Sequence, residues 1–182
     1  RALESERSDS LFKDPYAMLL AGERGRKISE AMPQISRYTQ WTVVSRTVII
    51  DRLIESLVRD GVDAVVNLGA GLDSRPYRMN LPRDLEWIEA DYMNIIAYKT
   101  QMLRNEIPKC KLARIPVELA NDEKRRDFLR NTVPDRRKVL VLTEGVIPYL
   151  TPEQVADLGR DLKSEQRIAY WIAEYFDRRV YR

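Results

Sequence analysis

The sequence predicts an α/β domain in which a parallel, doubly wound sheet follows N-terminal helices. Short apolar runs alternate with helical stretches after residue 60, and one such run leads into a Gly-x-Gly turn at residues 69–71. The chain has 182 residues, 44% of them hydrophobic, which is enough for one sizeable core. We therefore expect a helical segment over 1–60 packed on a ligand-binding α/β core over 61–182, the two forming one structural domain.

Helical signals come first along the chain. Asp14 followed by Pro15 is typical of an N-cap with proline at the first helical position, and Gly22 is a suitable stop. A long amphipathic helix is predicted from 36 to 60, ending at Gly61, because apolar-facing positions recur there every three or four residues: Val43, Thr47, Ile50, Ile54 and Leu57. We expect this helix to pack on the sheet.

Five strands are predicted, at 64–68, 85–90, 112–117, 139–143 and 167–173. Helices are expected between them at 93–105, at 122–130 and in a segment that begins with Thr151-Pro152-Glu153-Gln154, which has the spacing of a capping box. Strands that alternate with helices in this order favour right-handed crossovers and helices on both faces of the sheet.

The Gly-x-Gly turn indicates which kind of ligand the sheet binds. Glycine lets the backbone turn tightly and approach a ligand closely, but a dinucleotide fingerprint also needs Gly or Ala at the sixth position. Here the sixth position is Ser74, and the fifth is Asp73, whose carboxylate would repel a pyrophosphate and attract an ammonium or sulfonium group. The turn therefore favours S-adenosylmethionine over NAD, with a tight turn that binds no ligand as the ordinary alternative.

Acidic residues also follow the later strands. Asp91 closes the second strand, about 20 residues after the glycines, where a carboxylate can accept hydrogen bonds from ribose hydroxyls. Glu118 and Leu119 follow the third strand and offer a polar and an apolar contact to a base, while Glu144 follows the fourth and could face an ammonium group. One such carboxylate is more often solvated or a helix cap, but a set of them at one edge of the sheet points to a ligand.

Composition excludes several function classes. The sequence has no histidine, which rules out Ser-His-Asp and Cys-His catalysis and imidazole-dependent zinc sites, and we expect no metal. Basic and acidic residues nearly balance, at 31 and 28, and the basic runs 124–126 and 136–138 lack interleaved aromatics, so solvated faces are expected there and no nucleic-acid partner. The single cysteine, Cys110, is expected to be a small core or loop residue.

No apolar run reaches membrane-spanning length, and no signal-peptide pattern is visible. We therefore expect a cytoplasmic protein with no membrane partner. Nothing in the sequence indicates an oligomeric state.

Three motifs together resemble the leucine carboxyl methyltransferase family, and most closely its bacterial branch of S-adenosylmethionine-dependent O-methyltransferases, which includes polyketide-tailoring enzymes. They are Asn67-Leu68-Gly69-Ala70-Gly71-Leu72-Asp73-Ser74-Arg75, then Trp87-Ile88-Glu89-Ala90-Asp91 with Tyr98-Lys99, and Thr143-Glu144-Gly145-Val146-Ile147-Pro148-Tyr149-Leu150. The resemblance extends to residues 4–9 and 14–17, so it covers nearly the whole chain. It implies a Rossmann-like, class I methyltransferase fold with S-adenosylmethionine as the cofactor.

The resemblance also implies roles for individual residues. Arg46 would bind the cofactor carboxylate, unless it is only a solvated helix charge, and Tyr149 would lie near the substrate entrance, unless it is a core aromatic. Where the family usually has aspartate, this chain has Glu118, whose extra methylene alters the expected contact with adenine. The implied cofactor-binding set is Arg46, Gly69, Ala70, Gly71, Asp91, Glu118, Leu119 and Glu144.

The family sheet has seven strands, whereas this sequence stops after the fifth, so we expect the C-terminal strands to be missing and the strand at 167–173 to present an open edge. The expected function is methyl transfer from S-adenosylmethionine to a carboxylate or hydroxyl of a small metabolite such as a polyketide. The alternatives are an NAD-dependent oxidoreductase and a non-catalytic S-adenosylmethionine-binding module.

Overall fold

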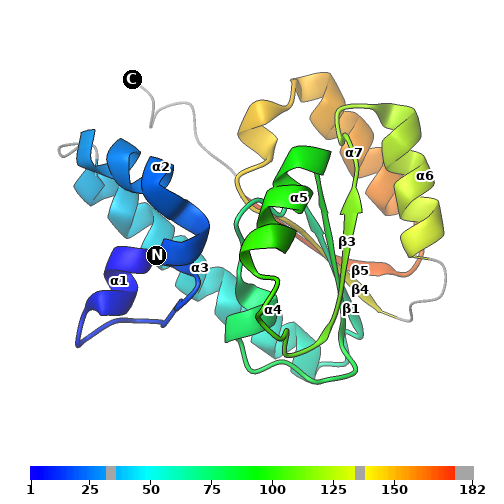
Figure 1. The fold of residues 1–182 in the computed structure, drawn as a ribbon. Helices are drawn as coiled ribbons and strands as arrows, with labels where there is room; N and C mark the ends of the chain where they lie inside the picture. The colour runs from blue at the N-terminus through cyan, green and yellow to red at the C-terminus, as the bar shows by residue number, and fades with distance from the viewer. Residues whose placement is uncertain (32–35, 134–137, 175–182) are drawn as a thin grey trace.

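The strands form one five-stranded parallel sheet with the order β3-β2-β1-β4-β5. The sheet lies in the right half of Figure 1, and the N-terminal helices extend to the left. The structure is a computed structural model that describes residues 1–31, 36–133 and 138–174. The strands are β1 (Ala64–Leu68), β2 (Glu86–Asp91), β3 (Lys111–Pro116), β4 (Val139–Thr143) and β5 (Ile168–Ala173). All four strand pairings are parallel, and β1 lies in the middle of the sheet. The chain reverses direction across the sheet after β3, so that β1 and β4 lie side by side and their carboxyl ends form the crevice in which open α/β sheets bind ligands.

Helices precede the sheet and connect its strands. They are α1 (Ala2–Glu6), α2 (Ala17–Ala31), α3 (Ser36–Arg59), α4 (Arg75–Arg78), α5 (Met93–Met102), α6 (Asp122–Thr132), the short 3₁₀ helix η1 (Ile147–Tyr149) and α7 (Pro152–Ser164). The predicted capping box is present at the start of α7, where Gln154 N–H donates to Thr151 Oγ1 and Thr151 N–H donates to the Gln154 side chain.

The two faces of the sheet carry separate apolar clusters. Val66 and Val141 point to the face covered by α6 and α7, where Leu129 and Leu158 are buried. The opposite face is packed against α3 through Ile50 and Ile54, together with Val65, Trp87 and Leu140 from the strands. Central strands buried on both sides are the pattern expected of a doubly wound sheet, so the predicted fold class is confirmed.

Several predicted boundaries are wrong by a few residues. The prediction began a helix at Pro15, but α2 begins at Ala17 after a turn in which Asp14 Oδ1 accepts a hydrogen bond from Tyr16 N–H. Gly22 leaves the helical conformation, with φ of +59°, and two helical segments of α2 meet there at a kink, so the predicted stop ends the first segment but not α2 as a whole. The kink persists because Tyr98 of α5 donates its hydroxyl to the carbonyl of Leu20 at 2.9 Å.

Other differences concern ends and short elements. The helix predicted at 93–105 ends at Met102, and the one predicted at 122–130 extends to Thr132. The strands β2, β3 and β5 are each displaced by about one residue from their predicted ranges. The short helices α1, α4 and η1 were not predicted because none of them is long enough to show a hydrophobic period.

The structure describes the basic run 124–126 but only part of the run 136–138. Arg125 is not part of a solvated face, because its side chain is buried and pairs with Asp161 at 2.6 Å, and this corrects the prediction for 124–126. Residues 136 and 137 of the second run lie outside the described residues, as does the segment after Glu174. Within the described ranges, no helix combines the length and the apolar character that a membrane crossing requires.

Candidate functional site

The glycine turn after β1 lies over the end of β2. Gly69 N–H and Ala70 N–H both donate to the carbonyl of Ala90, at 2.7 and 3.1 Å. Gly69 has φ of +67° and Gly71 has φ of +47°, a region that other residues rarely adopt. A Cβ on Gly69 would also lie 2.4 Å from Cγ2 of Val146, in the segment after β4. Glycine is therefore required at position 69 both by its conformation and by its neighbour.

Asp91 lies against this turn. Its Oδ2 accepts a 2.6 Å hydrogen bond from Gly71 N–H, and its Oδ1 accepts one from Tyr92 N–H at 2.7 Å. A carboxylate has about four acceptor positions, so each oxygen can still accept a further hydrogen bond. Asp91 can therefore bind a hydroxylated ligand, which is the role the sequence predicted for it.

Glu89, two residues earlier, cannot take this role. It is fully buried, and its two oxygens accept hydrogen bonds from Lys99 Nζ at 2.7 Å and Arg114 Nε at 2.9 Å. Burial raises the pKa of Glu89, while the two cations act against that rise. Glu89 is therefore part of a buried ionic cluster beneath the site.

Asp73 holds the turn from within. Asn67 Nδ2 donates to its Oδ2 at 2.8 Å, and Arg75 donates its N–H to Oδ1 and its Nη1 to Oδ2. Burial acts to raise the pKa of Asp73, but the cations of Arg75 and Lys99 outweigh it and hold this pKa well below the usual range. Asp73 is thus ionised, and its charge is paired with that of Arg75. The sequence predicted that this charge faces the ligand, but it did not predict the pairing with Arg75.

Arg75 connects three carboxylates from different parts of the chain. Its fully buried guanidinium reaches Asp51 of α3 at 2.7 Å, Asp73 at 3.0 Å and Glu144 after β4 at 2.6 Å. Burial acts to lower the pKa of Arg75, and these three carboxylates reverse that effect and raise it. Arg75 belongs to the first motif, but no role was predicted for it, since a contact with a residue 69 positions away leaves no local pattern.

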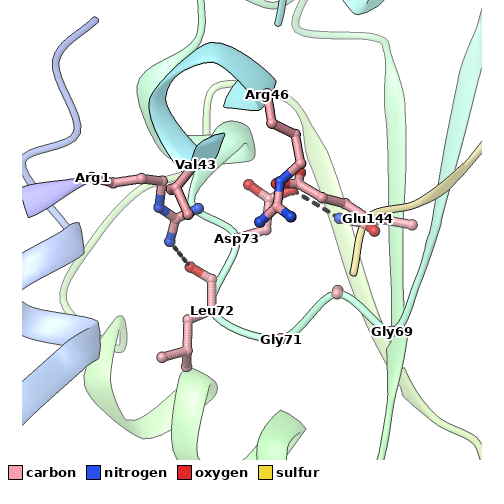
Figure 2. Close-up of a pocket in the computed structure, with 10 residues that line it drawn as sticks. Arg1, Val43, Arg46, Gly69, Gly71, Leu72, Asp73 and Glu144 are labelled. Atoms are coloured by element: carbon pink, nitrogen blue, oxygen red, sulfur yellow. Dashed lines mark hydrogen bonds and ion pairs between the residues drawn. The ribbon is translucent and has the colours of Figure 1, made fainter. Parts of the chain in front are cut away.

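Arg46 projects from α3 toward the same point, as Figure 2 shows, and lies close to Glu144. Its Nε lies 2.9 Å from Glu144 Oε1, and its Nη1 donates to Glu174 Oε1 at 2.6 Å. Three-quarters of its side chain is shielded from solvent, with 25% exposed. Arg46 is therefore not merely a solvated helix charge.

Two cavities meet at the glycine turn. The smaller, of about 210 Å³, is polar, and it is lined by Arg1, Val43, Arg46, Asn67, Gly69, Ala70, Gly71, Leu72, Asp73 and Glu144 (Figure 2). The larger, of about 540 Å³, is mostly apolar, and it is lined by Gly69, Gly71, Asp91, Tyr92, Ile95, Val117, Leu119, Ala120, Gly145, Val146, Tyr149 and Leu150. Since both include Gly69 and Gly71, an elongated ligand could lie across the turn with one charged and one apolar end.

The structure places most of the predicted site residues around these cavities. Leu119 lines the larger cavity, but Glu118 is exposed and pairs with Lys124 Nζ at 3.1 Å. Tyr149 also lines the larger cavity and is 87% exposed, so the alternative of a core aromatic is wrong. Glu118 is thus the one predicted site residue that lines neither cavity.

Glu174 was missed by the sequence analysis. It follows β5, and its Oε2 accepts a hydrogen bond from Gly145 N–H at 2.9 Å while its Oε1 pairs with Arg46. The rule that residues closing parallel strands face the site would have identified it, had it been applied to the fifth strand as it was to the others. Among the described residues, no group of three or more acidic or cysteine side chains is placed to hold a metal ion.

Comparisons with known proteins agree with this geometry. A family model described as leucine carboxyl methyltransferase matches residues 1–162. A protein of Frankia alni that carries the name putative S-adenosyl-L-methionine-dependent methyltransferase is 32% identical over 168 residues, which is 87% of this chain and 58% of that protein. One of Streptomyces coelicolor with the same name is 37% identical over 131 residues, or 67% of this chain and 46% of that protein.

A crystal structure of a DUF574 family protein from Streptomyces avermitilis has a similar fold, with a TM-score of 0.53 and 16% identity over 89% of this chain and 61% of that one. The chain thus spans about half the length of the curated relatives it matches. The match to the family model covers most of the sequence and includes the glycine turn, Asp91 and Glu144. The chain belongs to the leucine carboxyl methyltransferase family.

Proposed function

We propose that the protein binds S-adenosylmethionine and transfers its methyl group to an oxygen of a small-molecule acceptor. The observation that carries this proposal is a pair of cavities that both include Gly69 and Gly71 in their lining, one with Arg46 and Glu144 and the other with Asp91 and Leu119. This order of groups matches a ligand with a zwitterionic amino-acid end, a ribose and a planar base. The names of the relatives support the same cofactor.

The chain's residues fit such a ligand. Arg46 would bind the carboxylate, Glu144 would face the ammonium, and Asp91 would accept hydrogen bonds from the ribose. Leu119 and Val146 would contact the base in the apolar cavity. A Cβ on Gly69 would lie 2.4 Å from Cγ2 of Val146, so glycine lets the turn lie directly against the segment after β4, which also lines the apolar cavity.

NAD fits less well. A pyrophosphate needs free N–H groups at a helix N-terminus, but the helix after this turn, α4, has only four residues, and the N–H of Arg75 already donates to Asp73. The N–H of Arg75, which a dinucleotide-binding turn would offer to phosphate, is therefore occupied by Asp73. This disfavours the alternative of an NAD-dependent oxidoreductase.

Methyl transfer from S-adenosylmethionine requires the protein mainly to align the methyl donor with the acceptor oxygen. When bound, the cofactor supplies a methyl group already activated on sulfonium sulfur. The chain's residues hold the donor in place and exclude water, which is where most of the rate enhancement of such a displacement arises. A carboxylate acceptor has a pKa of about 4 and is ionised at neutral pH, so it needs no base. That agrees with a sequence that contains no histidine.

Methyl transfer itself separates an enzyme from a non-catalytic binding module. The protein is incubated with methyl-labelled S-adenosylmethionine and with panels of small carboxylic acids and phenols, and labelled esters and ethers are measured. We expect label in at least one oxygen acceptor, with a rate that is flat between about pH 6 and 8 for a carboxylate and rises with pH for a hydroxyl. Binding of the cofactor with no transfer to any acceptor in either panel would favour the module.

A further inference from the structure

Glu174 joins three elements at the polar end of the site. It lies directly after β5, its Oε1 accepts a 2.6 Å hydrogen bond from Arg46 of α3, and its Oε2 accepts a 2.9 Å hydrogen bond from Gly145 N–H, after β4. Its side chain is 12% exposed, and it lines neither cavity. Any effect of Glu174 on ligand binding is therefore indirect and acts through Arg46 or Gly145.

Arg46 needs a residue that fixes its orientation. Long arginine side chains lose much rotamer freedom when they are held in one geometry, so a ligand that had to order Arg46 would bind less tightly. Glu144 is a poor candidate for this task. Its Oε2 is already paired with Arg75, and Arg46 Nε, although 2.9 Å from Glu144 Oε1, is buried without hydrogen-bond geometry.

The bond to Glu174 is the well-formed one. Glu174 is itself held by the backbone of Gly145, so its carboxylate is a fixed point rather than a second mobile side chain. Within the described part of the chain, the contacts of Arg46 use Nε and Nη1, which leaves Nη2 to meet a ligand.

We propose that Glu174 is a positioning residue that pre-orients Arg46 for the carboxylate of the cofactor's amino-acid end. The inference rests on the proposed function and adds a residue that acts only on that end of the ligand. The adenosine end would lie in the other cavity, with Asp91 and Leu119. Glu174 reaches that cavity only through the N–H of Gly145, and the side-chain oxygen of a Glu174→Gln variant can still accept that hydrogen bond.

Two ligands separate these ends. S-adenosylhomocysteine carries both, whereas 5′-methylthioadenosine keeps the adenosine and the thioether but lacks the amino-acid carboxylate and ammonium. Dissociation constants for both are measured by calorimetry with the full chain and with Glu174→Gln, which is neutral but nearly isosteric. Glu174→Asp serves as a second variant, because its shorter side chain cannot reach Arg46 and Gly145 together. Glu55→Gln is the matched control, on an exposed position of α3.

We expect Glu174→Gln and Glu174→Asp to raise the dissociation constant of S-adenosylhomocysteine by about fivefold or more, which is within the range of coupling energies inside one ion-pair network. The dissociation constant of 5′-methylthioadenosine should stay within twofold of its value for the unchanged chain. Glu55→Gln should change neither. In an Arg46→Ala background, Glu174→Gln should have no further effect, since the residue through which it acts is gone.

Unchanged binding of S-adenosylhomocysteine by both folded Glu174 variants would overturn the inference. Tighter binding would also overturn it, because it would show that the carboxylate of Glu174 competes with the ligand's carboxylate for Arg46. Equal weakening of both ligands would also overturn it and assign Glu174 a general structural role. Failure of the unchanged chain to bind S-adenosylhomocysteine would instead overturn the proposed function. The two failures are therefore distinguishable.

Discussion

Gly71 N–H donates a 2.6 Å hydrogen bond to Oδ2 of Asp91, a residue 20 positions further along the chain. This bond ties the second glycine of the turn to the carboxylate at the end of β2, so that the shape of the turn and the placement of the acid are fixed together. A ligand that uses the remaining acceptor positions of Asp91 therefore meets a group whose orientation is already set.

The first prediction concerns Asp91. Asp91→Asn keeps one oxygen acceptor for the backbone but loses the charge that strengthens hydrogen bonds from ribose hydroxyls, so S-adenosylhomocysteine should bind about tenfold or more weakly. Calorimetric titration measures this, with the exposed Asp84→Asn as the matched control. Affinity within twofold of the unchanged chain would assign the acidic contact to another residue.

The second prediction concerns Arg46. Arg46→Lys keeps the charge but loses the planar fork, and Arg46→Ala loses both, so affinity for S-adenosylhomocysteine should fall in the order Arg, Lys, Ala. Arg52, an exposed residue on the same helix, gives the control variant Arg52→Ala, for which no change is expected. Binding by Arg46→Ala equal to that of Arg52→Ala would show that Arg46 takes no part in holding the ligand.

The third prediction compares two glycines. Gly69→Ala introduces a Cβ at 2.4 Å from Val146 and strains a φ of +67°, whereas Gly61→Ala strains a φ of +92° but meets nothing within 4 Å. Both should lose about 1–2 kcal/mol of stability from the left-handed conformation. Only Gly69→Ala should also abolish ligand binding. Thermal unfolding and titration of both variants check this, and normal binding by Gly69→Ala would contradict the account of the turn.

The fourth prediction concerns pH. The pKa of Asp73 is lowered in the folded protein, so the stability it contributes is present above its unfolded pKa of about 4 and is lost as pH falls through the folded value. Asp73→Asn should cost about 1–3 kcal/mol near neutral pH, because Arg75 keeps Asp51 and Glu144 but loses one buried charge-assisted hydrogen bond. The gap between variant and parent should then narrow as pH falls below about 5.

Denaturant unfolding at a series of pH values measures this gap. A difference in unfolding free energy that stays constant down to the acid limit of the folded state would show that the ionised carboxylate of Asp73 is not what stabilises the turn.

The strands and the long helix could be predicted because their signals are local. Val65, Val66 and Leu68 belong to a short run that is apolar except for Asn67, and Ile50 and Ile54 recur at helical spacing, so a window of a dozen residues contains each pattern. The break at Gly22 was predicted, but the helical segment that continues after it could not be, since a glycine that ends a helix and one that bends it have the same local sequence signal. What decides between them is the hydroxyl of Tyr98, on a helix far along the chain.

The same distinction applies to the site. Gly69, Gly71 and Asp91 carry a spacing that a single sequence reveals, and they meet in the structure as that spacing implies. The pairing of Arg46 with Glu174 joins residues that are 128 positions apart, so no local sequence pattern predicts it. Glu118 shows the converse: its position directly after the third predicted strand suggested a ligand contact, but its exposed side chain pairs with Lys124.

The central claim is that the glycine turn binds S-adenosylmethionine and not a dinucleotide, and calorimetric titration of the chain with S-adenosylhomocysteine, S-adenosylmethionine and NAD tests it most directly. We expect saturable, one-to-one binding of the two S-adenosyl compounds and at least about tenfold weaker binding of NAD, because Asp73 and the short helix α4 offer pyrophosphate no free helix N-terminus. NAD binding as tight as that of S-adenosylhomocysteine, or tighter, would contradict the claim.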